Sequence, residues 1–338
     1  MNSPMDRYIA QSLKPWESRT WSGARLEEKF LAPDNETILK LTFENGRVAL
    51  QTGRTSQPGR AAPIHKYLSE VAGRFPELQL VIYLCTADHP ELLLADDAPF
   101  FTFAKTLDSR FIVMPDQFFT NNFSRYHRSA AQGSLDADVD NASLKYPWST
   151  KIDRAVFRSK DFKYADLCMA GLKWPKLVDA KIASQPEKCV QELQQLQFEE
   201  LAENYPAELL CGPRLDIAGQ VQYKYLLNTP ACWDSTYWKL RSNSLLFSLT
   251  KIHDRSKDND HLSTHQWYSY FMEPFRHYIP CTLDDLAEKI SWAQAHDAEA
   301  RQIAEDGSRL AKEELTYEKS QLYVGALLRQ FAALNRDS

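Results

Sequence analysis

The chain has 338 residues, of which 43% are hydrophobic, 25% charged and 12% aromatic. This composition excludes a disordered, collagen-like or coiled-coil protein, and the length suggests one large or two medium-sized domains. The 45 acidic residues outnumber the 40 lysines and arginines, which gives a net charge of −5. Because phosphate contacts dominate binding to nucleic acids, this acidic balance argues against nucleic acid as a partner.

The N-terminal half alternates strand and helix signals. Apolar and polar side chains alternate on both sides of Asn45-Gly46, which predicts a β-hairpin. Helical spacing follows at 64–75, and the compact apolar run 78–85 predicts a buried strand. Shorter strands are predicted at 110–116 and 153–159. The polar stretch between them, about 119–147, has few periodic positions and is interpreted as an active-site loop or a flap.

The C-terminal half continues the same rhythm. Residues 187–204 have the pattern of an amphipathic helix, and strands are predicted at 222–228, 244–249 and 277–281. Thr282 followed by Asp285 is typical of a helix start, and two helical runs follow at 283–296 and 298–315. Helices that alternate with buried strands predict an α/β protein with two lobes.

Several kinds of site are excluded or disfavoured by motif. The 11 glycines form neither G-x-G-x-x-G nor a P-loop, and H-E-x-x-H and G-x-S-x-G are absent. The acidic run 136–141 lacks the spacing of a calcium loop, so we interpret it as a solvated acidic loop and expect no metal. His261 and His265 are interpreted as a surface helix start.

The six cysteines are scattered and form no C-x-x-C pair, so they are expected to be small buried hydrophobes, which fits a reducing compartment. No apolar stretch has the length of a membrane span, and the first residues are too polar for a signal peptide. These patterns predict a cytoplasmic protein, either free or peripheral on the inner face of the membrane.

Four strings in a fixed order are more specific than any single motif. They are WSTKIDRAVFRSK at 148–160, QYKYLLN at 222–228, WDSTYWKLRSNSLLF at 233–247, and the HYIP–DDL–HD–IA–G pattern within 277–311. Together they resemble glycosyltransferase family 90 over about residues 76–325. That family includes capsule-associated proteins, lipopolysaccharide-modifying transferases of bacteria and KDEL-tailed protein O-glucosyltransferases of animals.

The resemblance implies a fold of two Rossmann-like lobes with a cleft between them, as in GT-B glycosyltransferases. Residues 1–150 would form the N-terminal, acceptor-side lobe and residues 151–325 the C-terminal lobe that binds the nucleotide sugar. The final helix would pack back on the first lobe. The implied activity is inverting, metal-independent transfer of a sugar, glucose or xylose, from a UDP-sugar to a hydroxyl.

The resemblance also assigns the catalytic base. In the family this is an Asp that follows a strand, and the run LVIYLCTADHPE places Asp88 there. A carboxylate at the carboxyl end of a strand in an α/β sheet lies where such sheets bind ligands. Asp88 is therefore expected to take the proton of the acceptor hydroxyl; an ordinary Asp-x-Pro turn is the structural alternative.

Donor-binding residues are carried over from two elements. Arg158 matches the family's strand that ends in Arg-Gly-Ser, with Ser159 in place of the Gly and Lys160 or Lys163 in place of a second Arg. The start of the helix at 233–244 offers hydroxyls and backbone N–H groups to a diphosphate. The residues expected to contact the donor there are Ser235, Thr236, Tyr237, Lys239 and Ser242.

Phe101 and Phe103 match a family region near the acceptor. No cofactor is expected, because the UDP-sugar is a co-substrate. The acceptor would be a glycan or glycolipid, such as lipopolysaccharide core or capsule. Two alternatives remain: a protein O-glucosyl- or O-xylosyltransferase, and a non-catalytic relative that binds a glycan or nucleotide, which the altered 157–160 element favours.

Overall fold

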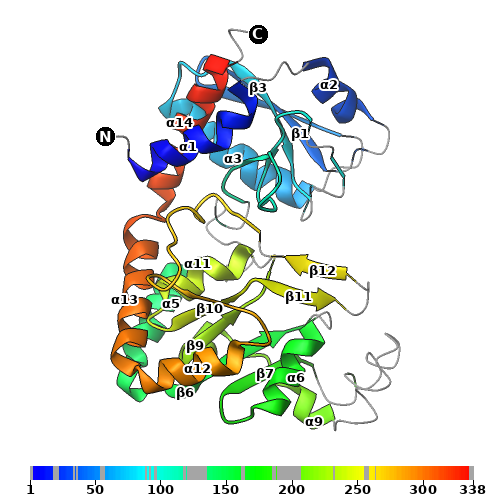
Figure 1. Ribbon diagram of the computed structural model, residues 1–338. Helices are drawn as coiled ribbons and strands as arrows, with labels where there is room; N and C mark the ends of the chain where they lie inside the picture. Colours follow the sequence, from blue (N-terminus) through cyan, green and yellow to red (C-terminus); the bar gives the residue numbers. More distant parts are fainter. Residues whose placement is uncertain are drawn as a thin grey trace. The chain divides into compact units, whose positions relative to one another are not determined.

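The computed structural model describes residues 3–17, 23–32, 35, 37–53, 58–87, 90, 93–94, 97–116, 119, 135–160, 164–184, 188, 207–230, 233–254, 259–262 and 264–334. The chain forms two compact units (Figure 1). Unit 1 comprises Met1–Ser129, Thr264–Phe271 and Glu314–Ser338, and unit 2 comprises Ala130–Ser263 and Met272–Glu313. The division therefore falls before α5 (Leu135–Lys145) and not after residue 150, because α5 packs against α10 (Ile217–Val221) and α11 (Trp233–Arg241).

Unit 1 is built on a mixed sheet with the strand order β2-β1-β3-β4-β5. Its strands are β1 (Ile38–Glu44), β2 (Arg47–Thr52), β3 (Leu80–Cys85), β4 (Phe101–Thr102) and β5 (Ile112–Val113). β1 pairs antiparallel with β2 and β3, whereas β3, β4 and β5 are parallel. The predicted hairpin is confirmed, and its turn has φ of 51° at Asn45 and 73° at Gly46, the positive values that a two-residue turn requires.

The helices of unit 1 are α1 (Pro4–Glu17), α2 (Gly23–Leu31), α3 (Pro58–Arg74) and α14 (Tyr317–Leu334). α3 packs against β1 and β2, and α14 packs against α1 and α3. Tyr67 of α3 donates a hydrogen bond to the Ser320 hydroxyl of α14 at 3.0 Å. The final helix is thus part of the N-terminal unit, although the preceding helix α13 (Asp297–Glu313) belongs to unit 2.

Unit 2 is built on a six-stranded parallel sheet with the order β13-β10-β9-β6-β7-β8. Its strands are β6 (Ile152–Ser159), β7 (Val178–Ala183), β8 (Cys211–Gly212), β9 (Tyr223–Asn228), β10 (Leu245–Leu249) and β13 (Ile279–Cys281). The chain adds β7 and β8 on one side of β6 and then returns to place β9 on the other side. This is the doubly wound order of a Rossmann fold, with its switch point between β6 and β9. The Rossmann-like prediction is confirmed for this unit.

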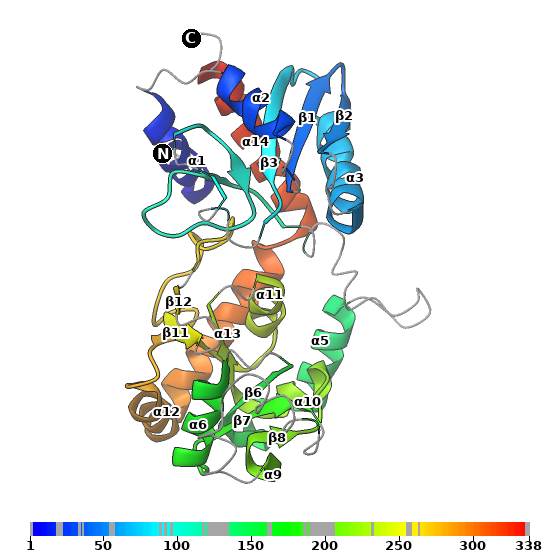
Figure 2. The same ribbon diagram turned by 90° about the vertical axis from the view of Figure 1, so that its right-hand side faces the viewer.

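Helices lie on both faces of this sheet (Figure 2). α6 (Ala165–Lys173) packs against β7, α12 (Leu286–Ala295) against β6, α13 against β10 and α10 against β9. α6, α12 and α13 share one apolar core with the strands. The core between strands and helices is apolar, with Leu167, Tyr225, Phe247 and Ile290 almost without exposed surface. The predicted pairing of Thr282 with Asp285 is present, because Thr282 N–H donates to the Asp285 carboxylate at 2.7 Å and Asp285 N–H donates back to the Thr282 hydroxyl. α12 itself begins later than predicted, at Leu286, with Asp285 as its N-cap. Unit 2 also contains the short helices η3 (Trp148–Thr150) and α9 (Ala207–Leu210).

Two expectations from the sequence are wrong. The stretch interpreted as a loop at 119–147 contains the helix α5, in which Leu135, Val139 and Ala142 are buried. His261 begins no helix, because it lies in β12 (Asn259–Leu262), which forms an antiparallel hairpin with β11 (Lys251–Asp254). Apart from Lys188, the predicted helix at 187–204 lies outside the described residues.

Cysteine chemistry differs from the expectation in one place. Cys85, Cys168 and Cys281 are buried free thiols, as predicted, but Cys211 is disulfide-bonded. In the described part of the chain, no helix combines the length and the apolar character needed to span a membrane.

Candidate functional site

The carboxyl edge of the parallel sheet in unit 2 is the first place to search for a ligand site. In doubly wound sheets, ligands bind outside the carboxyl ends of the strands at the switch point, where successive loops diverge. Here the switch point lies between β6, which is followed by Lys160, and β9, which ends at Asn228 and leads into α11. The fold therefore brings together two elements that the sequence assigned to donor binding.

Asn228 organises the start of α11. Its side-chain Nδ2 donates to the Thr236 hydroxyl at 2.9 Å, and its Oδ1 accepts from the Ser235 hydroxyl at 3.0 Å. Asn228 is only 5% exposed, so these bonds form in a shielded environment. The last residue of the strand thus holds two hydroxyls in the first turns of the helix, where N–H groups and the helix dipole favour an anion. Asn228 is not among the site residues predicted from the sequence, although it is the last residue of a predicted strand.

Lys239 of α11 forms hydrogen bonds with the same cluster. Its ammonium donates to the Leu227 carbonyl at 2.8 Å and to Asn228 Oδ1 and Ser235 Oγ, both at 3.1 Å. The residue is 5% exposed, so its ammonium group contacts Asn228 and Ser235 and not the solvent. Lys239 therefore positions Asn228 and Ser235 and adds a positive field behind them.

Arg158 has a partner within the sheet. Its guanidinium donates to the Asp179 carboxylate and carbonyl, at 3.0 and 2.7 Å, and its side chain is 6% exposed. Asp179 also accepts from the Tyr223 hydroxyl at 2.6 Å. Burial opposes ionisation of Asp179, but the hydrogen bonds from Arg158 and Tyr223 outweigh it and lower the pKa of the carboxyl. Asp179 lies opposite Val156 in the middle of β6, so the Arg158 side chain turns back along the sheet to reach it.

Lys160, in contrast, is exposed just after β6 and has no ion pair among the described residues. Of the two basic residues predicted on this element, Lys160 is the one at the carboxyl edge. The predicted contact of Arg158 with a diphosphate stays a prediction, and in the structure this guanidinium is bound to a carboxylate.

Tyr237 and Ser242 are also bound within unit 2. The Tyr237 hydroxyl donates to Asp136 at 3.1 Å, and burial is the main cause that raises its pKa. The Ser242 hydroxyl donates to the Lys239 carbonyl at 2.6 Å and has no exposed surface. Tyr237 thus faces α5, and Ser242 caps the end of α11. Neither side chain lies in the cluster around Asn228.

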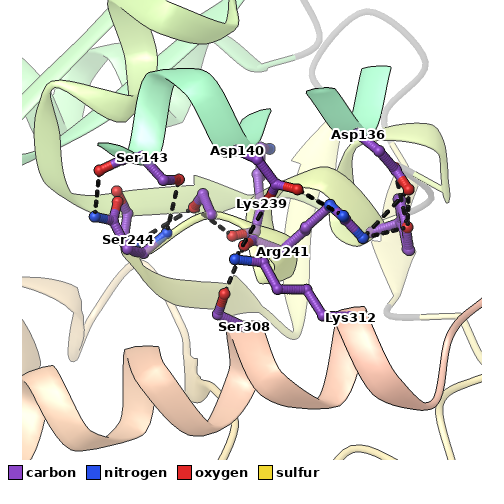
Figure 3. A network of polar contacts seen from close by, with 11 residues as sticks. Asp136, Asp140, Ser143, Lys239, Arg241, Ser244, Ser308 and Lys312 are labelled. Atoms are coloured by element: carbon purple, nitrogen blue, oxygen red, sulfur yellow. Dashed lines mark hydrogen bonds and ion pairs between the residues drawn. The ribbon is translucent and has the colours of Figure 1, made fainter. Parts of the chain in front are cut away.

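A network of charges surrounds the end of α11 (Figure 3). Arg241 pairs with Asp140 at 2.7 Å and with Asp136 at 3.2 Å, and Lys312 of α13 approaches Asp140 at 3.3 Å. Ser308 of the same helix donates to the Arg241 carbonyl at 2.7 Å. Burial raises the pKa of Asp136, although the charge of Arg241 opposes this. The acidic run 136–141, which the sequence predicts to be a solvated loop, therefore lies in α5, and two of its aspartates hold Arg241 of α11 by ion pairs.

The predicted base is carried by unit 1. Asp88 lies outside the described residues, but the strand before it is well defined. Thr86, 3% exposed, donates from its N–H and its hydroxyl to the Thr37 carbonyl, both at 2.9 Å. Arg60 of α3 donates to the Thr86 carbonyl. The chain thus leaves β3 at a fixed point on the carboxyl edge of the parallel strands, two residues before Asp88.

Phe101 and Phe103 are part of the core of unit 1. They are 0% and 1% exposed, and the ring of Phe101 packs edge-on against Phe331 of α14, with centroids 5.1 Å apart. Their predicted proximity to the acceptor stays a prediction, but the rings have no free face to offer it. Among the described residues, no group of three or more potential ligands is suited to a metal ion.

A doubly wound parallel sheet with a polar helix start at its switch point defines a Rossmann-type α/β protein with a candidate nucleotide site. The family model for glycosyl transferase family 90 matches residues 3–337, and the chain belongs to this family. It is 26% identical over 244 residues to human protein O-glucosyltransferase 3, covering 69% of this chain and 42% of that protein. It is 25% identical over 292 residues to bovine protein O-glucosyltransferase 1, covering 81% of this chain and 67% of that protein. Among solved structures, Anabaena HepE in complex with UDP and glucose is similar with a TM-score of 0.43 and 13% identity, over 80% of this chain and 76% of that one.

Proposed function

We propose that this protein transfers a sugar, glucose or xylose, from a UDP-sugar to an acceptor hydroxyl. Membership of glycosyltransferase family 90 supports the reaction class. The single observation that carries the donor assignment is the cluster at the switch point, where Asn228 holds Ser235 and Thr236 at the start of α11. A diphosphate at this place would receive hydrogen bonds from helix N–H groups, and would lie beside the hydroxyls of the cluster and the charge of Lys160.

The proposed reaction is a displacement with inversion at the anomeric carbon. Asp88 takes the proton from the acceptor hydroxyl while its oxygen forms the new glycosidic bond, and the bond to the UDP oxygen breaks. The departing diphosphate carries the developing negative charge, so cations and preorganised donors at its position accelerate the step. We propose that Lys160, Ser235, Thr236 and backbone N–H groups fill this role without a metal ion.

The acceptor that we propose is a hydroxyl of a surface glycan, such as lipopolysaccharide core or capsule. Transfer would then occur in the cytoplasm or at the inner face of the membrane, which is the location that the sequence patterns predict. A mass shift of one hexose or pentose on such a glycan, dependent on the UDP-sugar, would test this acceptor directly.

A protein hydroxyl is the second candidate acceptor, and two observations favour it. The relatives named above are protein O-glucosyltransferases. Cys211 is disulfide-bonded, and disulfides persist in oxidising compartments and are rare in the cytosol. Thiol titration of the protein isolated from its native source, before and after reduction, separates the two proposals, because a cytoplasmic protein would have its Cys211 thiol free.

The donor assignment is tested by adding one negative charge at the centre of the cluster. Asn228→Asp keeps the size of the side chain and the acceptors for Lys239 and Ser235, so the fold should survive. The new carboxylate would repel a bound diphosphate, and we expect UDP affinity to fall at least tenfold, about 1.4 kcal/mol. Isothermal titration calorimetry with UDP measures this, and thermal unfolding verifies the fold.

Gln222→Glu is the matched control, since it adds the same charge at the amino end of β9. It should leave UDP affinity within twofold of the unmodified protein. Equal weakening by both variants would show that only net charge matters, and unchanged UDP affinity in Asn228→Asp would refute the assignment of the donor to this edge.

A further inference from the structure

A second polar site lies on the other half of the same sheet edge. Unit 2 contains a pocket of about 370 Å³ at the carboxyl ends of β6, β7 and β8. Its lining residues are Lys160, Ala183, Ser184, Lys188, Gly212, Pro213 and Arg214. Three of the seven are cationic and none is acidic, in a chain whose net charge is −5.

Two of the three cationic side chains of this pocket, those of Lys160 and Arg214, are accessible to a ligand. Lys160 and Arg214 are exposed, and neither has an ion pair within the described part of unit 2. Elsewhere in this unit, Arg158 and Arg241 are bound to aspartates. Unpaired cations that converge on one pocket are suited to a group with several anionic oxygens, of which a phosphate is the commonest.

Part of the pocket wall is made of residues with small side chains. Ala183, Gly212 and Pro213 present little side chain, which leaves a smooth surface beside the charges. A Cβ at Gly212 would lie 2.7 Å from Cδ of Lys181, so the Lys181 side chain passes close to this glycine. The adjoining Cys211 is disulfide-bonded.

We propose that this pocket binds the phosphate group of a phosphorylated sugar, which places an anionic acceptor glycan next to the donor. The inference rests on the proposed function, which it deepens by giving the acceptor a charge. β8 lies three strands from β9, about 14 Å at the usual spacing of strands, so the part of the pocket at the end of β8, with Gly212, Pro213 and Arg214, lies apart from a diphosphate at α11. Lys160 borders both places. The hydroxyl of Ser184 and the smooth floor suit the sugar ring that carries the phosphate.

Calorimetry with glucose 6-phosphate tests the proposal in the full chain, with free glucose as the uncharged counterpart and with UDP present at saturation. We expect glucose 6-phosphate to bind and glucose to bind at least tenfold more weakly. Arg214→Gln should weaken glucose 6-phosphate about tenfold, because one charge-assisted contact is lost, and Arg214→Lys should restore most of the affinity. Arg276→Gln, an exposed arginine of unit 2 outside the pocket, should have no effect.

The outcomes separate this inference from the proposed function. UDP affinity, measured in the same series, should be equal in Arg214→Gln and the unmodified protein. Displacement of glucose 6-phosphate by UDP would mean that the pocket belongs to the donor site, and this would overturn the inference while leaving the donor reaction intact. No binding of glucose 6-phosphate, or equal binding by Arg214→Gln, would overturn it as well. Absence of UDP binding would refute the proposed function and not the pocket.

Discussion

At the scale of single residues, the basic side chains of unit 2 differ in what surrounds them. Arg158 is neutralised by Asp179, Lys239 is buried among oxygen acceptors, and Lys160 is exposed beyond the end of β6. A sequence motif assigns the same role to all three, because it records residue type and not direction. An incoming anion would therefore meet three different groups. The charge of Arg158 is compensated by Asp179, Lys239 acts only by positioning Asn228 and Ser235, and Lys160 is accessible.

Lys151 is a fourth case and gives a prediction for pH. Its ammonium is 6% exposed and donates to the Val221 carbonyl and, at 2.9 Å, to the Ser244 hydroxyl. Burial lowers the pKa of Lys151 to about 7. Between about pH 7 and 10 the unfolded chain holds this proton and the folded protein releases it. The free energy of unfolding should therefore rise with pH in this window, by up to about 1.4 kcal/mol per pH unit from this residue.

Lys151→Met tests that contribution. The variant keeps most of the length of the side chain and has no proton to release, so its stability should rise less steeply between pH 7 and 9. Urea unfolding at several pH values measures the difference between the two proteins. Parallel pH profiles for the two would contradict the neutralisation of Lys151 in the folded state.

At the scale of elements, α11 connects the candidate donor site to the body of unit 2. Its first turns carry Ser235 and Thr236, and its last residue, Arg241, is held between Asp136 and Asp140 of α5. The helix is thus fixed at both ends, by Asn228 of β9 at its start and by α5 and α13 at its end. The position of the hydroxyls at the switch point depends on this clamp.

Arg241→Met should break the clamp. It leaves two carboxylates without their arginine, and the guanidinium is 13% exposed while the carboxylates are about one-third exposed. We expect a loss of about 1 to 3 kcal/mol in the free energy of unfolding, between the values for surface and buried pairs. UDP affinity should fall as well. Arg241→Lys should retain part of the stability and part of the UDP affinity.

Arg301→Met provides the control, since Arg301 forms an exposed pair with Glu305 on α13. Urea unfolding of this variant should differ from the unmodified protein by less than about 0.5 kcal/mol. If Arg241→Met is no more destabilising than Arg301→Met, the network at α5 does not stabilise the unit.

Local patterns in the sequence predicted most of the elements of both units. The hairpin, β3, β6, β9, β10, β13 and α12 follow from short-range alternation, apolar runs and capping, which need no distant partner. α5 was missed because its acids look solvated until Arg241, 101 residues away from Asp140, supplies their charge. Its buried positions 135, 139 and 142 have helical spacing, which was the signal available.

The candidate site was predicted in part for a similar reason. Ser235 and Thr236 follow a predicted strand, so their place at the carboxyl edge could be inferred from the order of elements. Tyr237 is the next residue on the helix and points to α5, which a motif cannot reveal. The pairing of Arg158 with Asp179, 21 residues away, likewise depends on the register of β6 and β7.

At the scale of the whole molecule, the chain returns to unit 1 twice after it has built most of unit 2. Thr264–Phe271 and Glu314–Ser338 belong to unit 1, so neither unit is one continuous stretch of sequence. α14 packs closely on α3: a Cβ at Gly325 would lie 2.1 Å from the ring of Phe75. Unit 1 therefore depends on the last helix of the chain.

Gly325→Ala measures this dependence. The added methyl group forces Phe75 or the helix to move, and overpacking of this kind costs about 1 to 3 kcal/mol. Gly73→Ala, where a Cβ meets nothing within 4 Å, should not destabilise the protein. Thermal unfolding of the two variants tests the contact, and equal midpoints would contradict the packing of α14 on α3.

The most direct test of the proposed transfer reaction is turnover by Asp88→Asn, with UDP release measured from a UDP-sugar in the presence of acceptor. The amide cannot take a proton, so we expect turnover to fall by about 10²- to 10⁴-fold while UDP affinity stays within twofold. Asp97→Asn, which changes an exposed acid of unit 1 paired with Arg25, should retain full turnover. Turnover of Asp88→Asn within tenfold of the unmodified protein, or no UDP release by the unmodified protein from any UDP-sugar, would contradict the account.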